Sequence, residues 1–508
     1  MADETTLQPG AKVASTGPSH RIVLTILAHP DPGRVGERAL LPKSGATELA
    51  RRSPDFGAGP LDDPYISRKP SRLVVSRGTL RVEPNMAGAA LQMNGAPLTT
   101  ATTLTPEALD AGAVLDVGGR AAILLQRVLE VPPERDQRGL VGISDAVESV
   151  RRQIRQVADL DVGVLIRGES GVGKELVAQA VHRASRRKHG PFVSVNMAAL
   201  TPTTAASALF GHRRGAFTGA DRARRGLFRE ASGGTLFLDE IGEAPTELQT
   251  MLLRALETGE ITPVGQDEPV SVDVRVVAAT DASLEEAISD GRFRLPLLHR
   301  LAGFELMVPP LRTRREDIAM LLLHFLRQEL VKTGEEHRLD PTPKGADAWL
   351  SASLVGRLCA ADWPGNVRQL RNVARQLVIA SRGSAHLQMT PAVERALGPQ
   401  ESSDPPPPAA PAPSPAARPA ELDDAAVLEA LRAHDFRPTA TARALGMSKT
   451  SLYALIEASP RIRKAKDLTV DQIRAALAEE GAVPGAARRL EVSARGLRLR
   501  MTELGLES

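Results

Sequence analysis

The stretch Gly168-Glu169-Ser170-Gly171-Val172-Gly173-Lys174-Glu175 decides the fold at the centre of this chain. It follows the apolar run VGVLI and precedes KELVAQAVHRASRR, whose apolar residues recur at helical spacing. Glycines in a strand-loop-helix turn backbone N–H groups toward one point, and Lys174 adds a cation for the β and γ phosphates. The stretch therefore predicts a nucleoside triphosphate site. Glu175 stands where a metal-binding Ser or Thr is usual, so Mg²⁺ must be held mainly elsewhere.

Two carboxylates, Asp239 and Glu240, end the apolar strand TLFLDE farther along the chain. Charge is costly at the end of a buried parallel strand unless a metal and a water share the site. We expect Asp239 to hold Mg²⁺ and Glu240 to orient or deprotonate the attacking water. The alternative for the glycine-rich loop alone is a tight turn with a surface lysine.

The rest of the chain predicts a multidomain protein. Alternating strand and helix periods predict an α/β domain, and purely helical periods after it predict a helical subdomain. Short β-branched runs near the start predict a β-sandwich. The expected regions are the sandwich at 21–130, the α/β ATPase subdomain at 138–312, its helical lid at 313–398, a proline-rich linker at 401–420, and helical units at 421–460 and 467–508.

Composition sets the outer limits. The chain has 508 residues, 42% hydrophobic and 25% charged, which excludes a single core, a membrane bundle and wholesale disorder. The start lacks a signal sequence and the single cysteine, Cys359, cannot form an internal disulfide, so we expect a cytoplasmic protein with no membrane partner. A formal charge of +3 means that any nucleic-acid binding must come from local basic clusters.

The tail contains an internal repeat. TARALGMSKTSLYALI from Thr441 matches AARRLEVSARGLRLRM from Ala486 at a constant offset of 45 residues. Each copy has a helix-turn-helix pattern, which predicts binding of double-stranded DNA. The candidate DNA contacts are Ser448, Lys449, Thr450, Ser451 and Tyr453 in the first copy, and Arg495 and Arg498 in the second. The alternative is a pair of helical hairpins that serve only dimerisation.

The second copy departs from the pattern at two positions. Glu491 replaces the turn glycine of the first copy, and Gly496 falls inside the expected recognition helix. Whether this copy extends the DNA footprint or packs on the first is left open by the sequence.

The hexapeptide GAFTGA at 215–220 adds a specific resemblance. Together with GESGVGKE and GGTLFLDEIGE, it resembles the central domain of the bacterial enhancer-binding proteins, AAA+ activators of RNA polymerase carrying sigma-54, over about 140–397. The resemblance implies ATP and Mg²⁺ as cofactors, a hexameric ring, and contact of Phe217 and Thr218 with sigma-54. From the residues alone, a hairpin turn with Phe217 in the core is the favoured interpretation of this loop, and the resemblance reverses that preference.

The same resemblance assigns further site residues. It implies that Asn196 hydrogen-bonds to Glu240, and that Arg294 and Arg300 reach the neighbouring subunit's nucleotide. It places Asp281 at a sensor position where asparagine is usual, and Arg368 as the lid arginine that senses ATP. Between the two trans-acting arginines the family usually has acidic and aromatic residues, whereas this chain has LPLLH.

The N-terminal region resembles a forkhead-associated domain, a β-sandwich that reads phosphothreonine. Arginine, serine and asparagine side chains are suitable phosphate donors, and the candidates are Arg52, Ser67, Arg68 and Asn94. The histidine that braces the family's loop is missing, because the sequence there is Ser67-Arg68-Lys69-Pro70. A sandwich that binds partners without a phosphate is the alternative.

The sequence as a whole predicts a sigma-54-dependent transcription activator that binds upstream DNA and remodels the closed polymerase complex by ATP hydrolysis. One alternative is a DNA-binding AAA+ regulator or repressor that acts without sigma-54 contact. Another is an AAA+ chaperone or protease partner. The target promoters, the inducing signal and the sign of N-terminal control are not specified by the sequence.

Overall fold

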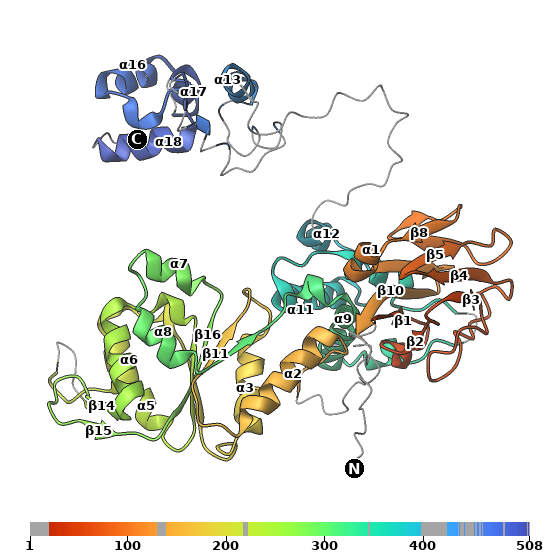
Figure 1. Ribbon diagram of the computed structural model, residues 1–508, viewed down its shortest axis with the longest axis horizontal. Helices are drawn as coiled ribbons and strands as arrows, with labels where there is room; N and C mark the ends of the chain where they lie inside the picture. The colour runs from red at the N-terminus through yellow and green to blue at the C-terminus, as the bar shows by residue number, and fades with distance from the viewer. Residues whose placement is uncertain are drawn as a thin grey trace, which may run out of the picture. The chain divides into compact units, whose positions relative to one another are not determined.

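The computed structural model divides into two compact units, 1–402 and 403–508, each described by itself (Figure 1). The described residues are 20–129, 139–216, 222–343, 346–397, 424–434, 461–480 and 483–504, with single residues 436, 441, 445, 452, 455, 456, 459 and 506.

The N-terminal part is a β-sandwich, as the sequence predicts. Its larger sheet has the strand order β2 (Arg38–Leu40), β1 (His20–Ala28), β10 (Ala121–Leu129), β9 (Ala113–Val117), β6 (Leu91–Met93) and β7 (Ala96–Pro97). The smaller sheet has the order β3 (Gly45–Leu49), β4 (Ser71–Ser76), β5 (Thr79–Glu83) and β8 (Thr102–Leu104), followed by helix α1 (Pro106–Ala111). The paired strands are antiparallel, and their inward side chains form one hydrophobic core between the sheets.

The centre of the chain is a parallel five-stranded sheet flanked by helices. The strand order is β12 (Phe192–Asn196), β13 (Thr235–Asp239), β16 (Arg275–Thr280), β11 (Val164–Arg167) and β17 (Phe304–Met307). The helices are α2 (Asp145–Ala158), α3 (Lys174–Ala184), α4 (Pro202–Phe210), α5 (Leu227–Glu230), α6 (Thr246–Thr258), α7 (Leu284–Ser289) and α8 (Leu295–Leu301). A short hairpin, β14 (Glu260–Ile261) and β15 (Val270–Ser271), extends from it. In a parallel sheet the carboxyl ends of the strands share one edge, and ligands bind there.

The lid follows and is helical, as the sequence predicts. It contains α9 (Arg315–Thr333), α10 (Ala352–Ala360), α11 (Asn366–Ala380) and α12 (Pro391–Leu397). Its core includes the fully buried Trp363, whose indole Nε1 donates to Leu358 O at 2.8 Å, and the buried Cys359. The same core continues into the sandwich, because Leu27, Ala28, Val114, Ala122 and Leu124 belong to it.

The C-terminal unit is helical. Its described helices are α13 (Asp424–Ala433), α16 (Val470–Glu480), α17 (Val483–Arg489) and α18 (Ala494–Glu503). The apolar side chains of its described residues form two clusters. Of the two departures of the second repeat, the structure explains Gly496, because a Cβ there would lie 3.1 Å from Ala465 Cβ. Glu491 takes a left-handed φ of 57° in the turn between α17 and α18, a conformation that favours glycine, and nothing in the structure explains glutamate there.

Among the described residues, none of the helices combines the length and the apolar character that crossing a bilayer requires.

Candidate functional site

The glycine-rich loop lies between β11 and α3, at the carboxyl edge of the parallel sheet. Gly171 and Gly173 have φ angles of 78° and 103°, which L side chains rarely adopt. A Cβ on Gly168 would lie 2.7 Å from Val308 O, so the loop also needs glycine there for space. The loop can therefore direct its backbone N–H groups at a ligand at the start of α3.

Lys174, the first residue of α3, is buried and donates from Nζ to Gly168 O at 2.7 Å and to Glu169 O at 3.3 Å. Burial lowers the pKa of Lys174, and the negative charges of Asp281, Asp239 and Glu240 oppose that shift. The ammonium group thus faces three carboxylates, two of which the acidic strand supplies.

Asp239 and Glu240 lie at the end of β13, beside that lysine. Burial raises the pKa of Asp239, although Lys174 and the Glu240 backbone N–H, which donates to Asp239 Oδ1 at 3.1 Å, act in the opposite direction. Glu240 has a left-handed φ of 54°, an uncommon conformation for a residue other than glycine. The chain turns sharply here and leaves the sheet at its ligand-binding edge.

Neighbouring strand ends bring two further predicted residues to this edge. Asn196 ends β12 and is the register partner of Asp239. Its Oδ1 accepts from Ala199 N at 3.3 Å, so its side chain caps the short turn after β12 here rather than bonding to Glu240. Asp281 follows β16 directly and is exposed.

The lid closes over the glycine-rich loop. A Cβ on Gly171 would lie only 2.5 Å from Gly365 O, and Arg368 N donates to Gly171 O at 3.2 Å. The Arg368 guanidinium donates to Ser170 Oγ at 3.3 Å. Val172 is buried below this contact, whereas Glu175 is exposed on α3.

Two residues that the sequence reasoning did not select hold the loop to the lid. Arg312 donates to both carboxylate oxygens of Glu169, at 2.5 and 2.8 Å, and Asn366 Nδ2 donates to the same carboxylate at 3.0 Å. These bonds lower the pKa of Glu169 to about 2, Arg312 contributing most. Asn366 lies in the WPGNVRQL stretch that supplied Arg368, so its position in that stretch was an available signal.

Arg294 and Arg300 lie at α8. Arg300 donates twice to Leu256 O of α6, at 2.8 and 2.6 Å, and the Arg294 side chain is exposed. Within the described part of the chain, neither guanidinium donates a hydrogen bond to the glycine-rich loop of its own subunit.

The GAFTGA segment is described only at Gly215 and Ala216, so Phe217 and Thr218 lie outside the described residues. Its base is held by His212, whose backbone exchanges two 3.0 Å hydrogen bonds with Arg224. The imidazole Nδ1 lies 2.7 Å from Ser207 Oγ, and Nε2 lies 2.9 Å from Arg222 O.

The candidate phosphate-binding residues of the sandwich do not all come together. Ser67 and Arg68 occupy the loop before β4, and the Arg51 backbone N–H donates to Ser67 O at 3.1 Å, which brings Arg52 near them. Asn94 lies instead in the turn between β6 and β7, where its Oδ1 accepts from Val114 N at 2.8 Å.

A different asparagine, Asn85, lies beside the loop that carries Ser67 and Arg68. Asn85 Nδ2 donates to Pro70 O at 3.1 Å, and a Cβ on Gly88 would lie 2.9 Å from Lys69 O. The segment PNMAGAA, which carries Asn85, was not selected from the sequence.

Most candidate DNA contacts in the tail lie outside the described residues, namely Ser448, Lys449, Thr450, Ser451 and Tyr453. Arg495 and Arg498 are on α18, and Arg498 is exposed.

The centre of the chain matches known families. Residues 140–307 match the Sigma-54 interaction domain, and residues 312–404 match the AAA+ ATPase lid domain. The DNA-binding transcriptional regulator NtrC of Escherichia coli K12 is 46% identical over 244 residues, 48% of this chain and 50% of NtrC. The anaerobic nitric oxide reductase transcription regulator NorR of Vibrio vulnificus is 46% identical over 243 residues, 48% of this chain and 46% of NorR.

A crystal structure of NtrX from Brucella abortus in complex with ATP matches at 33% identity with a TM-score of 0.44, over 63% of this chain and 69% of that one. This chain spans about half the length of the curated relatives it matches. The two family matches identify its centre as an AAA+ P-loop ATPase domain of the sigma-54 interaction type, with a helical lid.

Proposed function

We propose that this chain is a sigma-54-dependent transcription activator, which binds upstream DNA and uses ATP hydrolysis to remodel the closed complex of sigma-54 RNA polymerase. The observation that carries the proposal is the convergence of Lys174, Asp239, Glu240 and Arg368 on one glycine-rich loop within a domain of the sigma-54 interaction type.

The residues present fit Mg²⁺ and ATP. The loop backbone and Lys174 offer donors and a cation to the phosphates, and Asp239 offers a carboxylate to the metal, which commonly uses one or two carboxylates together with phosphate oxygens. Bound Mg²⁺ supplies charge neutralisation at the β and γ phosphates. The raised pKa of Asp239 supports this role. Burial makes the charged carboxylate costly, and a nearby cation would offset that cost.

We assign the water-orienting role to Glu240, with Asn196 as its neighbour across the strand ends. Arg368 and Asp281 face the loop from the lid and from β16, where they can report whether the γ phosphate is present. Asp281 adds a negative charge where asparagine is usual, which weakens phosphate binding unless a cation lies between them.

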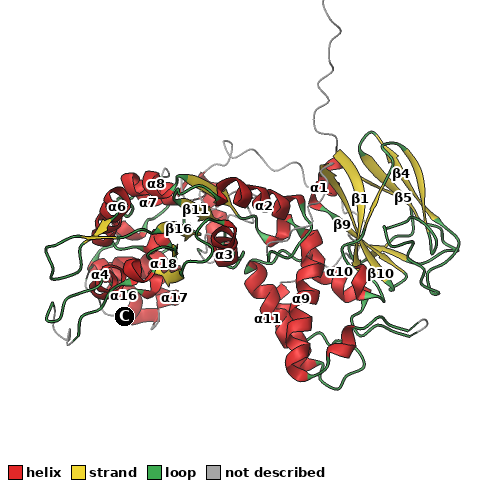
Figure 2. Ribbon diagram, turned by 90° about the horizontal axis from the view of Figure 1, so that it is seen from below, coloured by secondary structure: helices red, strands yellow, loops and turns green. Residues whose placement is uncertain are grey.

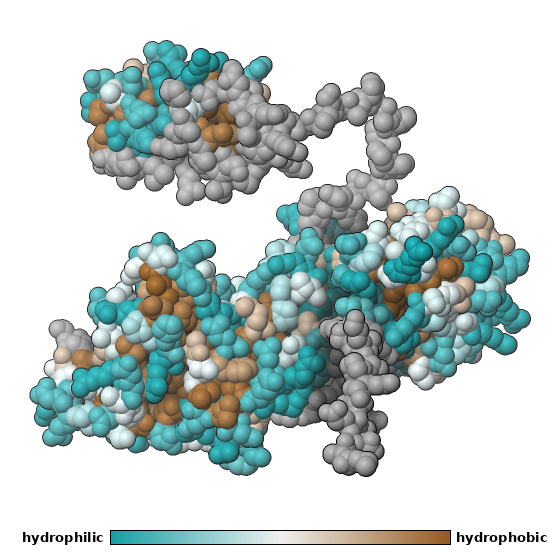
Figure 3. Space-filling model, viewed as in Figure 1, coloured by the Kyte–Doolittle hydropathy of each residue, from teal (hydrophilic) through white to brown (hydrophobic). Residues whose placement is uncertain are grey.

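Assembly into a ring, hexameric as in the resembling family, would complete the site. Arg294, just before α8, and Arg300, on α8, are exposed, and in a ring they would stabilise transition-state charge in the neighbouring subunit. Hydrophobic residues also gather on the surface of this subdomain (Figure 3), consistent with an interface between copies. Among its described residues, the exposed large apolar side chains are Leu160, Val162, Leu176, Leu295 and Met307.

The segment after Ala216 is the proposed contact with sigma-54, through Phe217 and Thr218. Its base is fixed by His212 and also touches the loop after β14, because Arg213 N donates to Val264 O at 3.1 Å. A movement of that loop would therefore reach the GAFTGA segment through a short backbone contact.

The tail is the proposed DNA-binding part, through two helix-turn-helix units, the second of which consists of α17, the turn after it and α18. The sandwich is the proposed regulatory part. If it binds a phosphothreonine partner in the manner of a forkhead-associated domain, Arg52, Ser67 and Arg68 are the donors, and Asn85 is better located than Asn94 to join them.

Two substitutions test the proposal. Lys174→Ala is expected to lower ATP hydrolysis by the purified chain about 100-fold, because it removes the phosphate-facing cation, while DNA footprinting stays unchanged. Thr218→Ala is expected to keep ATP hydrolysis and lose open-complex formation with sigma-54 polymerase in vitro. A Thr218→Ala protein that still activates would contradict the loop assignment, and binding of DNA with repression but no activation by the wild type would favour the alternative regulator.

A further inference from the structure

The outer face of the larger sheet is seated on the lid. Along β10, Ala122 and Leu124 belong to the lid core, whereas the alternate residues Ala121, Ile123 and Leu125 belong to the sandwich core. Helix α10 lies against this face (Figure 2), and Gly356 allows the approach, because a Cβ there would lie 3.3 Å from Val114 Cγ1. The two parts are packed as one body.

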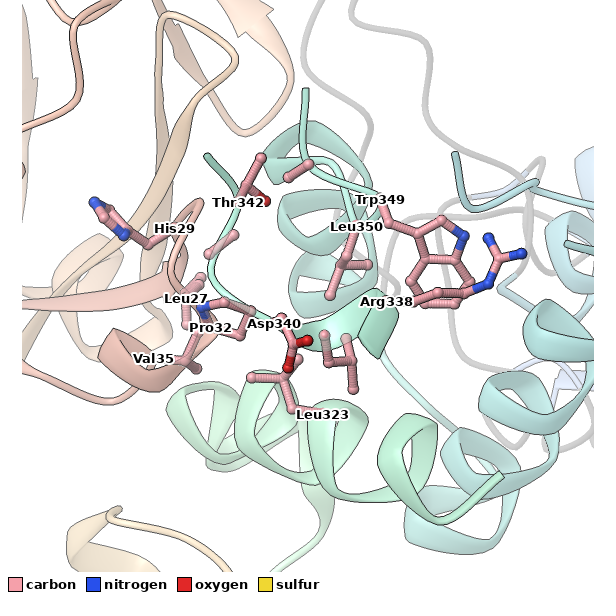
Figure 4. A pocket seen from close by; sticks show the side chains of 13 residues that line it. Leu27, His29, Pro32, Val35, Leu323, Arg338, Asp340, Thr342, Trp349 and Leu350 are labelled. Atoms are coloured by element: carbon pink, nitrogen blue, oxygen red, sulfur yellow. The ribbon is translucent and has the colours of Figure 1, made fainter. Parts of the chain in front are cut away.

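The apolar part of the contact has little unfilled space, whereas a larger pocket of about 340 Å³ lies beside Arg120, between the β9–β10 turn and the start of α10. Figure 4 shows side chains from both parts around a small cavity, among them Leu27 and Val35 of the sandwich and Leu323 and Leu350 of the lid. Its volume of about 20 Å³ is close to the space for one water. A backbone hydrogen bond also crosses here, from Thr342 N to Pro30 O at 2.8 Å.

A polar contact holds the other side of the lid. Arg120, in the turn between β9 and β10, donates to the buried Asp63 of the sandwich at 3.1 Å. The same guanidinium donates to Asp347 Oδ1 at 3.2 Å and to Ala346 O at 2.9 Å, both in the segment before α10. One arginine thereby ties the sandwich loop end to the lid.

The sandwich also reaches the start of α9. Arg38 of β2 donates to Ile143 O at 2.9 Å and lies 3.9 Å from the Glu316 carboxylate. Gln126 of β10 hydrogen-bonds to the same carboxylate. On the neighbouring residue, Asp317 Oδ2 accepts from Ser144 Oγ at 2.6 Å, at the entry to the ATPase domain.

The segment just before these acids contacts the glycine-rich loop. Arg314 is buried and donates to Val172 O at 3.2 Å, and Arg312 donates to both carboxylate oxygens of Glu169. Residues 312–317 are therefore bonded to the sandwich on one side and to the phosphate loop on the other. A shift of this segment would move both together, since packed interiors transmit displacement.

We propose that the sandwich positions the nucleotide site: Arg38 and Gln126 are positioning residues that hold the start of α9 against the glycine-rich loop. This inference rests on the proposed ATP site and adds that affinity for ATP depends on residues of the N-terminal sandwich. A partner bound at the sandwich loops would then act on the ATPase through the lid.

The test is ATP binding and turnover by full-length Arg38→Ala. We expect binding of ATP to weaken about five- to ten-fold, within the usual range of coupling between sites, while kcat at saturating ATP stays within about twofold. Arg38→Lys, which keeps a cation beside Glu316, should recover part of the affinity. Arg72→Ala is the matched control, because that exposed arginine pairs with Glu83 within the smaller sheet.

Unchanged ATP affinity in a folded Arg38→Ala protein would overturn the inference, and so would a fall in kcat with unchanged affinity. If Arg38→Ala does not fold, Gln126→Ala replaces it, since it leaves the Ile143 contact intact, with an expected weakening of about twofold or more. Failure of the wild type to bind or hydrolyse ATP would instead contradict the proposed function, so the two failures are distinguishable.

Discussion

The sandwich and the C-terminal helical unit are attached to the same ATPase in different ways. The sandwich shares a hydrophobic core with the lid and contributes hydrogen bonds to the start of α9. The tail follows the segment 401–420, rich in proline, and its described apolar residues form clusters of their own. A part that shares a core can change the shape of a site by packing, whereas a part on a proline-rich spacer acts mainly by raising local concentration.

The largest expected effect is on the free energy of unfolding, and it comes from replacing Asp317. This residue follows Glu316, which lies beside Arg38 of the sandwich. Asp317 is fully buried and accepts from Ile143 N at 2.7 Å, Ser144 N at 2.9 Å and Ser144 Oγ at 2.6 Å. Asp317→Ala would leave these donors buried without an acceptor, and should lower the free energy of unfolding by about 3–5 kcal/mol. Chemical denaturation of the full chain measures it.

The control for that substitution is Asp362→Ala. The Asp362 side chain is 83% exposed, and its carboxylate comes no nearer than 4.0 Å to the Arg315 guanidinium. It should change the free energy of unfolding by no more than about 0.5 kcal/mol. Equal effects of the two substitutions would contradict a central structural role for Asp317.

An intermediate effect is expected from pH. Burial, with the neighbouring Asp317 carboxylate adding to it, raises the pKa of Glu316 to about 7, against the opposing charge of Arg38. Because the folded state binds this proton more tightly than the unfolded chain does, its contribution to stability is present below about pH 4.5 and is lost as pH rises through 7. Glu316→Gln should remove this dependence and gain up to about 3 kcal/mol over the wild type at pH 8.

Free energies of unfolding measured from pH 5 to 8 on both proteins check this prediction. Wild-type and Glu316→Gln curves that run parallel across that range would show that Glu316 does not titrate in the folded protein as expected.

The smallest expected effect is in the tail. Arg432 of α13 pairs with Glu491 of the second repeat at 2.7 Å, but the two side chains are 56% and 39% exposed. Arg432→Ala should therefore lower tail stability by no more than about 0.5 kcal/mol and leave ATP affinity unchanged. Loss of ATP affinity in this variant would contradict the conclusion that the sandwich, but not the C-terminal helical unit, acts on the nucleotide site through packing.

The grouping of Lys174, Asp239 and Glu240 at one edge of the sheet was largely predictable, because these residues lie in local patterns. The glycine-rich loop and the acidic strand each bring their chemistry within a few residues, and the parallel sheet joins them at one edge. Glu169 was predicted as a loop residue, but its pairing with Arg312 joins positions far apart in the sequence. No local pattern could predict that bond.

The sandwich shows a second limit. Asn85 and Asn94 both lie in polar turns, and only strand pairing decides which turn lies beside Ser67. The run AAILLQ of β10 is apolar on both faces, which is typical of a strand buried on two sides. This pattern was an available signal of a second partner for the sheet, but it could not identify the lid as that partner.

The sequence by itself determined the parallel sheet, the phosphate loop, the helical lid and the β-rich start, because glycine positions and hydrophobic periods act over short distances along the chain. Only the tertiary structure decided that the sandwich rests on the lid and that Arg38, Glu316 and Arg314 connect it to the phosphate loop. Those contacts depend on which buried faces meet, and side chains distant in sequence acquire their partners only when the chain has packed.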